Sequence, residues 1–176
     1  CLPTNEAINM KRPFVQIRES GLLERVSFLA VVWALSILPS SAFDHRHTAF
    51  TAELQKYVGM SQVDYGEWKK SPANLKRYID DLKAIGPEEY SKFSEGEKKA
   101  LWLNAYNALT IYLVLEKYPI QGKKDYYPKD SIRQIDGFWE DNFITIGGKK
   151  ASLAQIEHNL LRRDFRDPRT HFAVVP

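Results

Sequence analysis

One apolar stretch constrains the fold of this chain more than any other part of it. Residues 101–115 read LWLNAYNALTIYLVL, and only two asparagines interrupt the run. Ser94 and Glu97 precede it with the spacing of a helix capping box, and Pro119 follows its end. These signals predict a helix from about Glu95 to Lys117. Because its fully apolar part is shorter than the roughly 20 residues that a membrane span requires, we expect a buried central helix.

The two asparagines give this helix a polar face. Asn104 and Asn107 are three residues apart, so their side chains share one side of the helix. A buried amide without partners costs about 1–3 kcal/mol, so both side chains need hydrogen bonds. Two interpretations follow: the amides belong to a structural network that fixes a loop against the helix, or they line a polar site.

Length and charge limit the function classes. A chain of 176 residues suits one domain. A net charge of +3 without a long basic run gives no indication of nucleic-acid binding. We expect an α+β domain, mostly helical, around the central helix, with a small antiparallel sheet near the C-terminus. We expect neither a metal site nor a cofactor, since the histidine at the third position of a chain cleaved before Phe43 is a spacing found by coincidence in most proteins, and the expected partner is an unidentified small molecule or protein.

The N-terminal 42 residues have the pattern of a secretory signal. Basic residues around Lys11 and Arg12 precede an apolar core at Val26–Leu38, and small residues lead to a cleavage position after Ala42. Residues 10–42 are therefore predicted to be a signal peptide, with residues 1–9 upstream of the natural start. The predicted location is periplasmic or secreted, without membrane contact after cleavage. The alternative is an uncleaved segment that anchors the protein in the inner membrane.

Cleavage would also remove Cys1, the only cysteine, and with it any disulfide or thiol nucleophile in the segment. Within the remaining chain, residues 43–62 are predicted to be a helical lead-in and residues 63–176 the main domain. Apolar spacing predicts helices at Thr48–Val58 and after Pro72, the latter with an inward stripe. That stripe consists of Leu75, Tyr78, Ile79 and Leu82.

The C-terminal third predicts a hairpin, a helix and a strand. Phe143–Ile146 and Lys149–Ala151 flank Gly147-Gly148, whose residues accept the positive φ values of a tight turn. Ser152 and Gln155 have capping-box spacing in front of a helix that we expect to end near Arg163. The run from Thr170 to Val175 is predicted to be a strand led by His171.

Three side chains in this region are candidates for chemistry. Glu157 lies within the predicted apolar face of its helix, where a carboxylate needs a cation or a hydrogen-bond donor. It is either a buried structural anchor or a site residue. His158 lies at the edge of that face, and Arg162, one turn further on, can approach it. His171 is equally consistent with a general base and with an ordinary surface histidine.

Three motifs together resemble one family. They are Trp102-Leu-Asn104-Ala-Tyr106-Asn107, Ile156-Glu157-His158 with Leu161-Arg162, and Asp167-Pro168-Arg169 with His171-Phe172-Ala173. Their order and spacing are similar to the domain of unknown function family 547 (DUF547), over about Val63 to Pro176. In that family the last motif usually continues into a cysteine-containing segment, so the resemblance implies a domain that is incomplete at its C-terminal end. The family brings no established biochemical activity.

Two functional hypotheses remain open. In the first, an uncharacterised secreted domain uses its polar residues as a structural network, and the loop from Tyr126 to Trp139 contacts a partner. In the second, full-length relatives are thiol-dependent hydrolases or acyl transferases whose nucleophile lies in the missing segment, with His171 as the base. The catalytic candidates are His171, Glu157, Asn104 and Asn107, and the binding candidates are Trp102, Tyr106, His158, Arg162 and Arg169.

Overall fold

The computed structural model of the chain describes residues 42–60, 62–167 and 169–174. The predicted upstream residues 1–9 and the predicted signal peptide 10–42, apart from Ala42, lie outside this described part. Residues 42–176 form one compact unit, so the predicted lead-in at 43–62 packs in the same unit as the main domain. Among the described residues, no helix combines the length and the apolar character needed to cross a bilayer.

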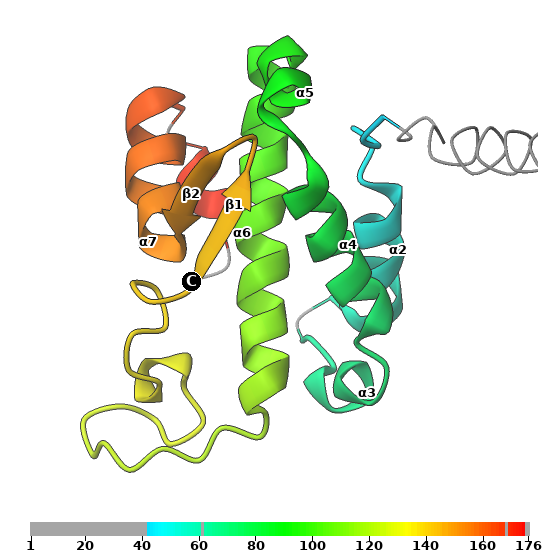
Figure 1. Ribbon diagram of the computed structural model, residues 1–176. Helices are drawn as coiled ribbons and strands as arrows, with labels where there is room; N and C mark the ends of the chain where they lie inside the picture. The colour runs from blue at the N-terminus through cyan, green and yellow to red at the C-terminus, as the bar shows by residue number, and fades with distance from the viewer. Residues whose placement is uncertain (1–41, 61, 168, 175–176) are drawn as a thin grey trace, which may run out of the picture. The chain divides into compact units, whose positions relative to one another are not determined.

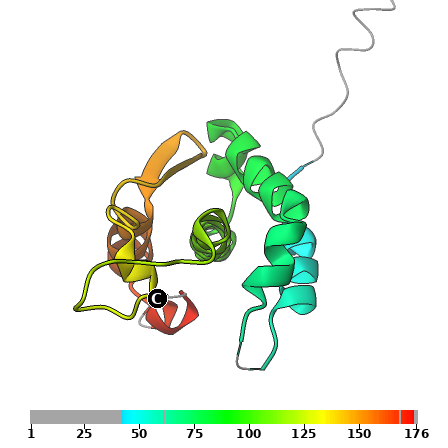
Figure 2. The same ribbon diagram turned by 90° about the horizontal axis from the view of Figure 1, so that it is seen from below.

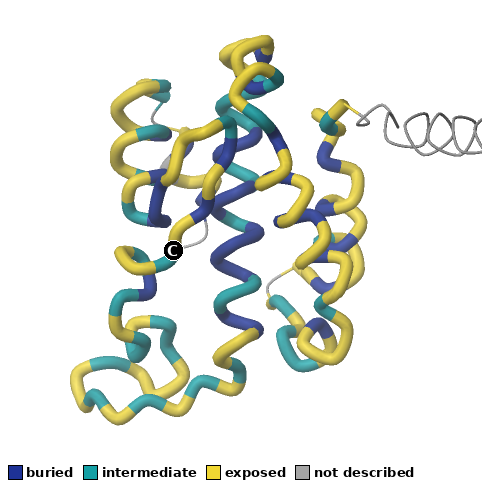
Figure 3. The backbone as a smooth tube through the Cα atoms, in the orientation of Figure 1, coloured by how far each residue is buried: buried dark blue, intermediate teal, exposed yellow. Residues whose placement is uncertain are grey.

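Helix α6 (Glu95–Lys117) is the centre of this unit and has the predicted bounds (Figure 1). Its capping box forms as expected: the Glu97 N–H donates to Ser94 Oγ at 3.2 Å, and the Ser94 N–H donates to Glu97 Oε2 at 2.7 Å. Buried and half-buried residues follow one another along its length (Figure 3). A helix with an apolar surface on nearly every side requires neighbours on more than one side, and it has them.

One side of α6 is covered by the N-terminal helices. These are α2 (Thr48–Tyr57), α3 (Tyr65–Lys70), α4 (Ala73–Ala84) and α5 (Pro87–Lys92). Helices α3 and α4 pack on α6, and α2 packs on the far side of α4 (Figure 2). The predicted stripe on α4 is buried at all four positions. Neither α3 nor α5 was predicted, because six residues are too few to establish a helical period.

The other side carries the β-hairpin, β1 (Phe143–Ile146) and β2 (Lys149–Ser152), which pair antiparallel as predicted. Gly147 and Gly148 have φ values of 58° and 76°, the positive values that the sequence implied. Gly147 is also required sterically, since a Cβ there would lie 2.4 Å from Tyr90 Cγ. The hairpin is therefore fixed both by its turn and by its contact with the segment before α6.

The helix predicted at Leu153 to Arg163 forms, but with an unexpected geometry. Its first three residues are α7 (Leu153–Gln155), and the rest is η2 (Ile156–Asp164), a π-helix that packs on α6. In a π-helix hydrogen bonds join residues five apart instead of four, so the residues that share a face change. A short 3₁₀ turn, η1 (Ile132–Gln134), lies in the long connection between α6 and β1.

The predicted strand at Thr170–Val175 is wrong. Thr170–Ala173 is a short helix, α8, which packs on η2. Both the N–H and the hydroxyl of Thr170 donate to the carbonyl of Asp167, at 3.1 and 2.7 Å, and this turn starts the helix. The β-branched and apolar residues of the segment favour a strand locally, but the described sheet contains only β1 and β2 and takes up no third strand.

Candidate functional site

Two neighbouring cavities lie between α6, η2 and the connection that precedes β1. The larger, of about 730 Å³, is lined by Tyr106, Ser131, Ile132, Arg133, Trp139, Glu157, Phe172 and Val174. The smaller, of about 500 Å³, is lined by Ala154, Glu157, His158 and residues of the 124–140 connection. Arg133, Trp139 and Glu157 line both cavities, so the two spaces meet at these three side chains.

Glu157 is held at this junction by a buried tyrosine of the central helix. Its side chain is 20% exposed, whereas Tyr106 is only 1% exposed. The Tyr106 hydroxyl is hydrogen-bonded to the Glu157 carboxylate and accepts a hydrogen bond from the Trp139 indole. Burial, followed by the negative charge of Glu157, raises the pKa of Tyr106 to about 12. Tyr106 is therefore a neutral donor at physiological pH and fixes the orientation of the carboxylate.

The partner of Arg162 differs from the predicted one. The Arg162 guanidinium lies 3.6 Å from Oε1 of Glu157, the residue five positions before it in the chain. Residues five apart come together in a π-helix, so η2 places Arg162 over Glu157 and not over His158. His158 is exposed and lines only the smaller of the two cavities.

The connection that contributes Arg133 and Trp139 is cross-linked by one side chain. The Gln134 amide donates to the carbonyls of Lys124 and Tyr127, at 2.8 and 3.0 Å, and accepts from the Lys124 N–H at 2.9 Å. The Ala154 N–H donates to the carbonyl of Trp139 at 3.0 Å, which attaches this segment to α7. An irregular stretch without secondary-structure periodicity thus becomes a fixed wall of the site.

Three predicted site residues line neither cavity, and two of them, Trp102 and Asn107, have structural contacts instead. Trp102 is fully buried and donates its indole N–H to Tyr90 Oη at 2.9 Å, so it belongs to the core. Asn104 and Asn107 are half-buried, whereas the sequence predicted buried amides. The Asn107 amide donates to the carbonyl of Ala173 at 2.8 Å and so fixes the end of α8 against α6. For Asn107 this favours the structural interpretation.

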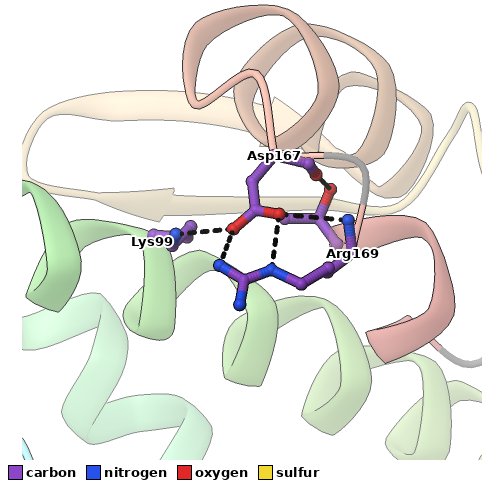
Figure 4. A network of polar contacts seen from close by, with 4 residues as sticks. Lys99, Asp167 and Arg169 are labelled. Atoms are coloured by element: carbon purple, nitrogen blue, oxygen red, sulfur yellow. Dashed lines mark hydrogen bonds and ion pairs between the residues drawn. The ribbon is translucent and has the colours of Figure 1, made fainter.

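Arg169 belongs to an ion-pair network that lines neither cavity. The Asp167 carboxylate accepts from Arg169 Nη2 at 2.8 Å and from Lys99 Nζ of α6 at 2.9 Å (Figure 4). The Arg169 guanidinium, then the Lys99 ammonium, holds the pKa of Asp167 well below its usual range. The side chain of Arg169 is 85% exposed. This network and the Asn107 amide both join the C-terminal segment to the central helix.

A comparison with known families decides what kind of domain contains this site. Residues 90–176 match the model of a family described as "Protein of unknown function, DUF547". The chain therefore carries a DUF547 domain. No curated protein and no solved structure matches the chain at a significant level. The match begins at Tyr90, later than the predicted Val63, so α2, α3 and α4 precede the matched part.

The DUF547 domain contains every residue that lines either cavity. Among the catalytic candidates whose side chains the structure describes, only Glu157 lines them, and among the described binding candidates only Tyr106 and His158 do. The side chain of His171 lies outside the described part of the chain, so its role as a base stays a prediction. Its helix nevertheless borders the site, since Phe172 and Val174 line the larger cavity.

Sequence reasoning did not identify Arg133 and Trp139 as site residues of the DUF547 domain. The Arg133 guanidinium lies 5.7 Å from the centre of the Tyr127 ring, a cation–π contact. The only signal in the sequence is the aromatic character of the connection, which led us to expect partner contacts between Tyr126 and Trp139. No group of three or more potential metal ligands is present among the described residues.

Proposed function

We propose that this DUF547 domain is a secreted or periplasmic binding domain that holds a small organic ligand in the joined cavities beside Glu157. The observation that carries the proposal is the shared junction: Arg133, Trp139 and Glu157 line both spaces. The larger volume, about 730 Å³, lies in the usual range of about 300–1,000 Å³ for small-molecule sites.

The chemistry of the junction supports binding. An indole, a carboxylate and a guanidinium meet there, which combines an apolar surface with groups that orient a ligand. Glu157 is already oriented by Tyr106 and Arg162, so its position does not depend on an arriving ligand. Such pre-organisation lowers the entropic cost of binding.

The binding proposal is tested by the NMR signal of one indole. Trp68 and Trp102 are fully buried, whereas Trp139 is half-buried at the site. Titration with small aromatic fragments is expected to shift the indole N–H signal of Trp139 and to leave those of Trp68 and Trp102 in place. The variant Trp139→Phe assigns the signal. The fourth tryptophan, Trp33, lies in the predicted signal peptide. Shifts that are equal at Trp68, Trp102 and Trp139, or absent from Trp139, would contradict a ligand site at the junction.

The proposed location rests on the sequence of residues 10–42 and is tested separately. We expect the intact mass of the protein isolated from its native host to correspond to a chain that begins at Phe43. A mass that retains residues 10–42 would favour the alternative, an inner-membrane anchor formed by the uncleaved segment.

A second candidate function is a thiol-dependent hydrolase or acyl transferase in full-length relatives. The position of α8 favours this second function. Phe172 of α8 and Val174, which follows the helix, line the larger cavity next to Glu157. The test is the replacement of His171 by alanine in a longer relative that contains the cysteine segment. Loss of activity with unchanged thermal stability supports this candidate, and loss of folding counts against it.

A further inference from the structure

We propose that the ligand of the larger cavity is a small organic anion, a carboxylate or a phosphate ester with an apolar body, and that Arg133 binds its charged group. This inference rests on the proposed binding function and specifies its ligand class. Whether the larger cavity favours an anion depends on which charged side chains around it already have an oppositely charged partner.

The three titratable side chains that line the larger cavity differ in this respect. Tyr106 is neutral at physiological pH, because its pKa is raised to about 12. The Glu157 carboxylate is balanced by Arg162 at 3.6 Å and accepts the Tyr106 hydrogen bond. For Arg133, no carboxylate lies within ion-pair distance in the described part of the chain. The cavity therefore presents one positive charge that the described residues do not neutralise.

The shape of that charge favours an oxyanion. A guanidinium presents its donors in a planar fork that matches the two oxygens of a carboxylate or a phosphate. The Tyr127 ring, 5.7 Å from the Arg133 guanidinium carbon, restricts where the guanidinium points. The backbone N–H of Arg133 donates to Ser131 Oγ at 3.2 Å, which fixes the base of the side chain. Arg133 is thus held at both ends while its charge stays available.

The remaining lining explains why the anion should be organic. Ile132, Trp139, Phe172 and Val174 give the cavity an apolar surface, and Phe172 is 88% exposed. An inorganic ion would leave this surface in water, whereas an apolar body would bury part of it, at about 25 cal/mol per Å². The cavity is therefore better suited to an aryl or alkyl carboxylate or phosphate than to the free ion.

A cationic ligand is the opposite possibility, since Glu157 also lines the cavity. A cation at Glu157 would have to compete with Arg162, and it would lie in the same cavity as Arg133. The smaller cavity is less suited to an anion, because Asp136 there is already paired with Lys124 and the Glu140 carboxylate lines it in addition to Glu157. These charges place the anion in the larger cavity, on the Arg133 side.

The test is a titration of the whole chain with four probes of similar size: benzoate, phenyl phosphate, benzamide and benzylamine. Binding is followed by the indole signal of Trp139. Either anion, or both, should bind about ten-fold or more tightly than neutral benzamide, because a charge-assisted fork is available only to the anions. Benzylamine should bind more weakly than benzamide. A preference for benzoate alone identifies a carboxylate as the group recognised, and a preference for phenyl phosphate alone identifies a phosphate.

Variants of Arg133 distinguish the contribution of its positive charge from that of the rest of the cavity lining. Arg133→Gln should reduce the ratio of anion affinity to benzamide affinity to about one, whereas Arg133→Lys should retain part of the preference. Arg163→Gln is the matched control: it removes the same charge from η2, and Arg163, 70% exposed, lines neither cavity. Because Arg133 is exposed, its replacement should not impair folding, which a melting curve verifies.

The possible failures are distinguishable. If benzamide or benzylamine binds as tightly as the anions, or if Arg133→Gln leaves the preference intact, the anion inference is overturned while a binding site at Trp139 stands. If no probe shifts the Trp139 signal, both the proposed binding function and the anion inference fail.

Discussion

Two glutamates on two helices show how differently this chain uses the same side chain. Glu53 on α2 is 5% exposed, and its carboxylate accepts from the Trp68 indole at 2.9 Å and the Asn74 amide at 3.1 Å. Glu157 on η2 is bonded by a tyrosine and paired with Arg162, but it also faces two cavities. The first carboxylate lies outside both cavities and joins three helices, and the second borders open space.

The surroundings of the two carboxylates indicate that Glu53 is a structural polar group and that Glu157 belongs to a candidate site. At Glu53 both donors are neutral, and one of them, the Trp68 indole, is fully buried, so the carboxylate is part of the core. At Glu157 the partner cation is 58% exposed, so solvent can take over part of its role. We therefore expect substitutions at Glu53 to affect stability most, and substitutions around Glu157 to affect binding most.

The largest expected effect is that of Glu53→Ala. It should lower the free energy of unfolding by about 3 kcal/mol, because the buried Trp68 indole loses its acceptor, at about 1–3 kcal/mol, and because truncating a side chain that is 5% exposed leaves a void. Urea denaturation measures the change. Gln55→Ala, at an exposed position of the same helix, should stay within about 0.5 kcal/mol of the original protein. A loss below 1 kcal/mol for Glu53→Ala would remove the contrast with Glu157.

A pair of tryptophans gives the next largest effect. Trp102→Phe should cost about 2 kcal/mol, because it leaves a void in the core and deprives the Tyr90 hydroxyl of its donor. Trp139→Phe, at the half-buried site position, should cost about 1 kcal/mol or less and weaken fragment binding. Comparing the two urea curves tests the distinction. Equal losses of stability would mean that Trp139 is as much a core residue as Trp102.

A smaller effect is expected from pH in the N-terminal region. Burial lowers the pKa of His47, which is 7% exposed and whose Nδ1 lies 2.7 Å from the Tyr78 hydroxyl oxygen. The unfolded chain therefore binds a proton first as the pH falls below about 6.5, and stability is lost in that direction by at most about 1.4 kcal/mol per pH unit.

Urea curves between pH 7 and 5 measure this dependence. His47→Gln should flatten it, whereas His45→Gln should leave most of it in place, because burial is the largest cause of the lowered pKa of His47 and the charge of His45 contributes least. An unchanged dependence in His47→Gln would exclude the buried histidine as its source.

The smallest change in stability is expected for Glu157→Gln, at about 1 kcal/mol or less, since Tyr106 keeps the Trp139 donor. Removing the carboxylate charge should also lower the pKa of Tyr106 from about 12, but only part of the way to its ordinary value of about 10, because burial is the larger cause of the rise. Tyrosine absorbance at alkaline pH measures this shift. A loss of several kcal/mol would instead make Glu157 a structural anchor, the interpretation that the sequence left open.

Local signals in the sequence predicted much of the fold. The capping residues Ser94 and Glu97, the apolar run behind them and Pro119 predicted the bounds of α6, because each acts within a few residues. Two adjacent glycines predicted the hairpin turn for the same reason. The motifs that resembled DUF547 were confirmed as a family match, over a shorter stretch than expected.

Other predictions failed where distant contacts decide. Val58, predicted as the last residue of its helix, follows the end of α2 and is 39% exposed, whereas the charged Glu53 within α2 is buried. Trp68 and Asn74 stabilise that carboxylate, and both belong to helices further along the chain. Similarly, the ion pair with Lys99, 68 residues away, holds the turn at Asp167 from which α8 starts.

By itself, the sequence determined the central helix, the hairpin and the family, because caps, turns and hydrophobic periods act between near neighbours. Only the tertiary structure decided which polar side chains border open space. Arg133, Trp139 and Glu157 come from a 3₁₀ turn, an irregular connection and a π-helix, and no local period relates them. Their meeting depends on how Gln134, Ala154 and Tyr106 hold these segments together, and such contacts form only when the whole domain is folded.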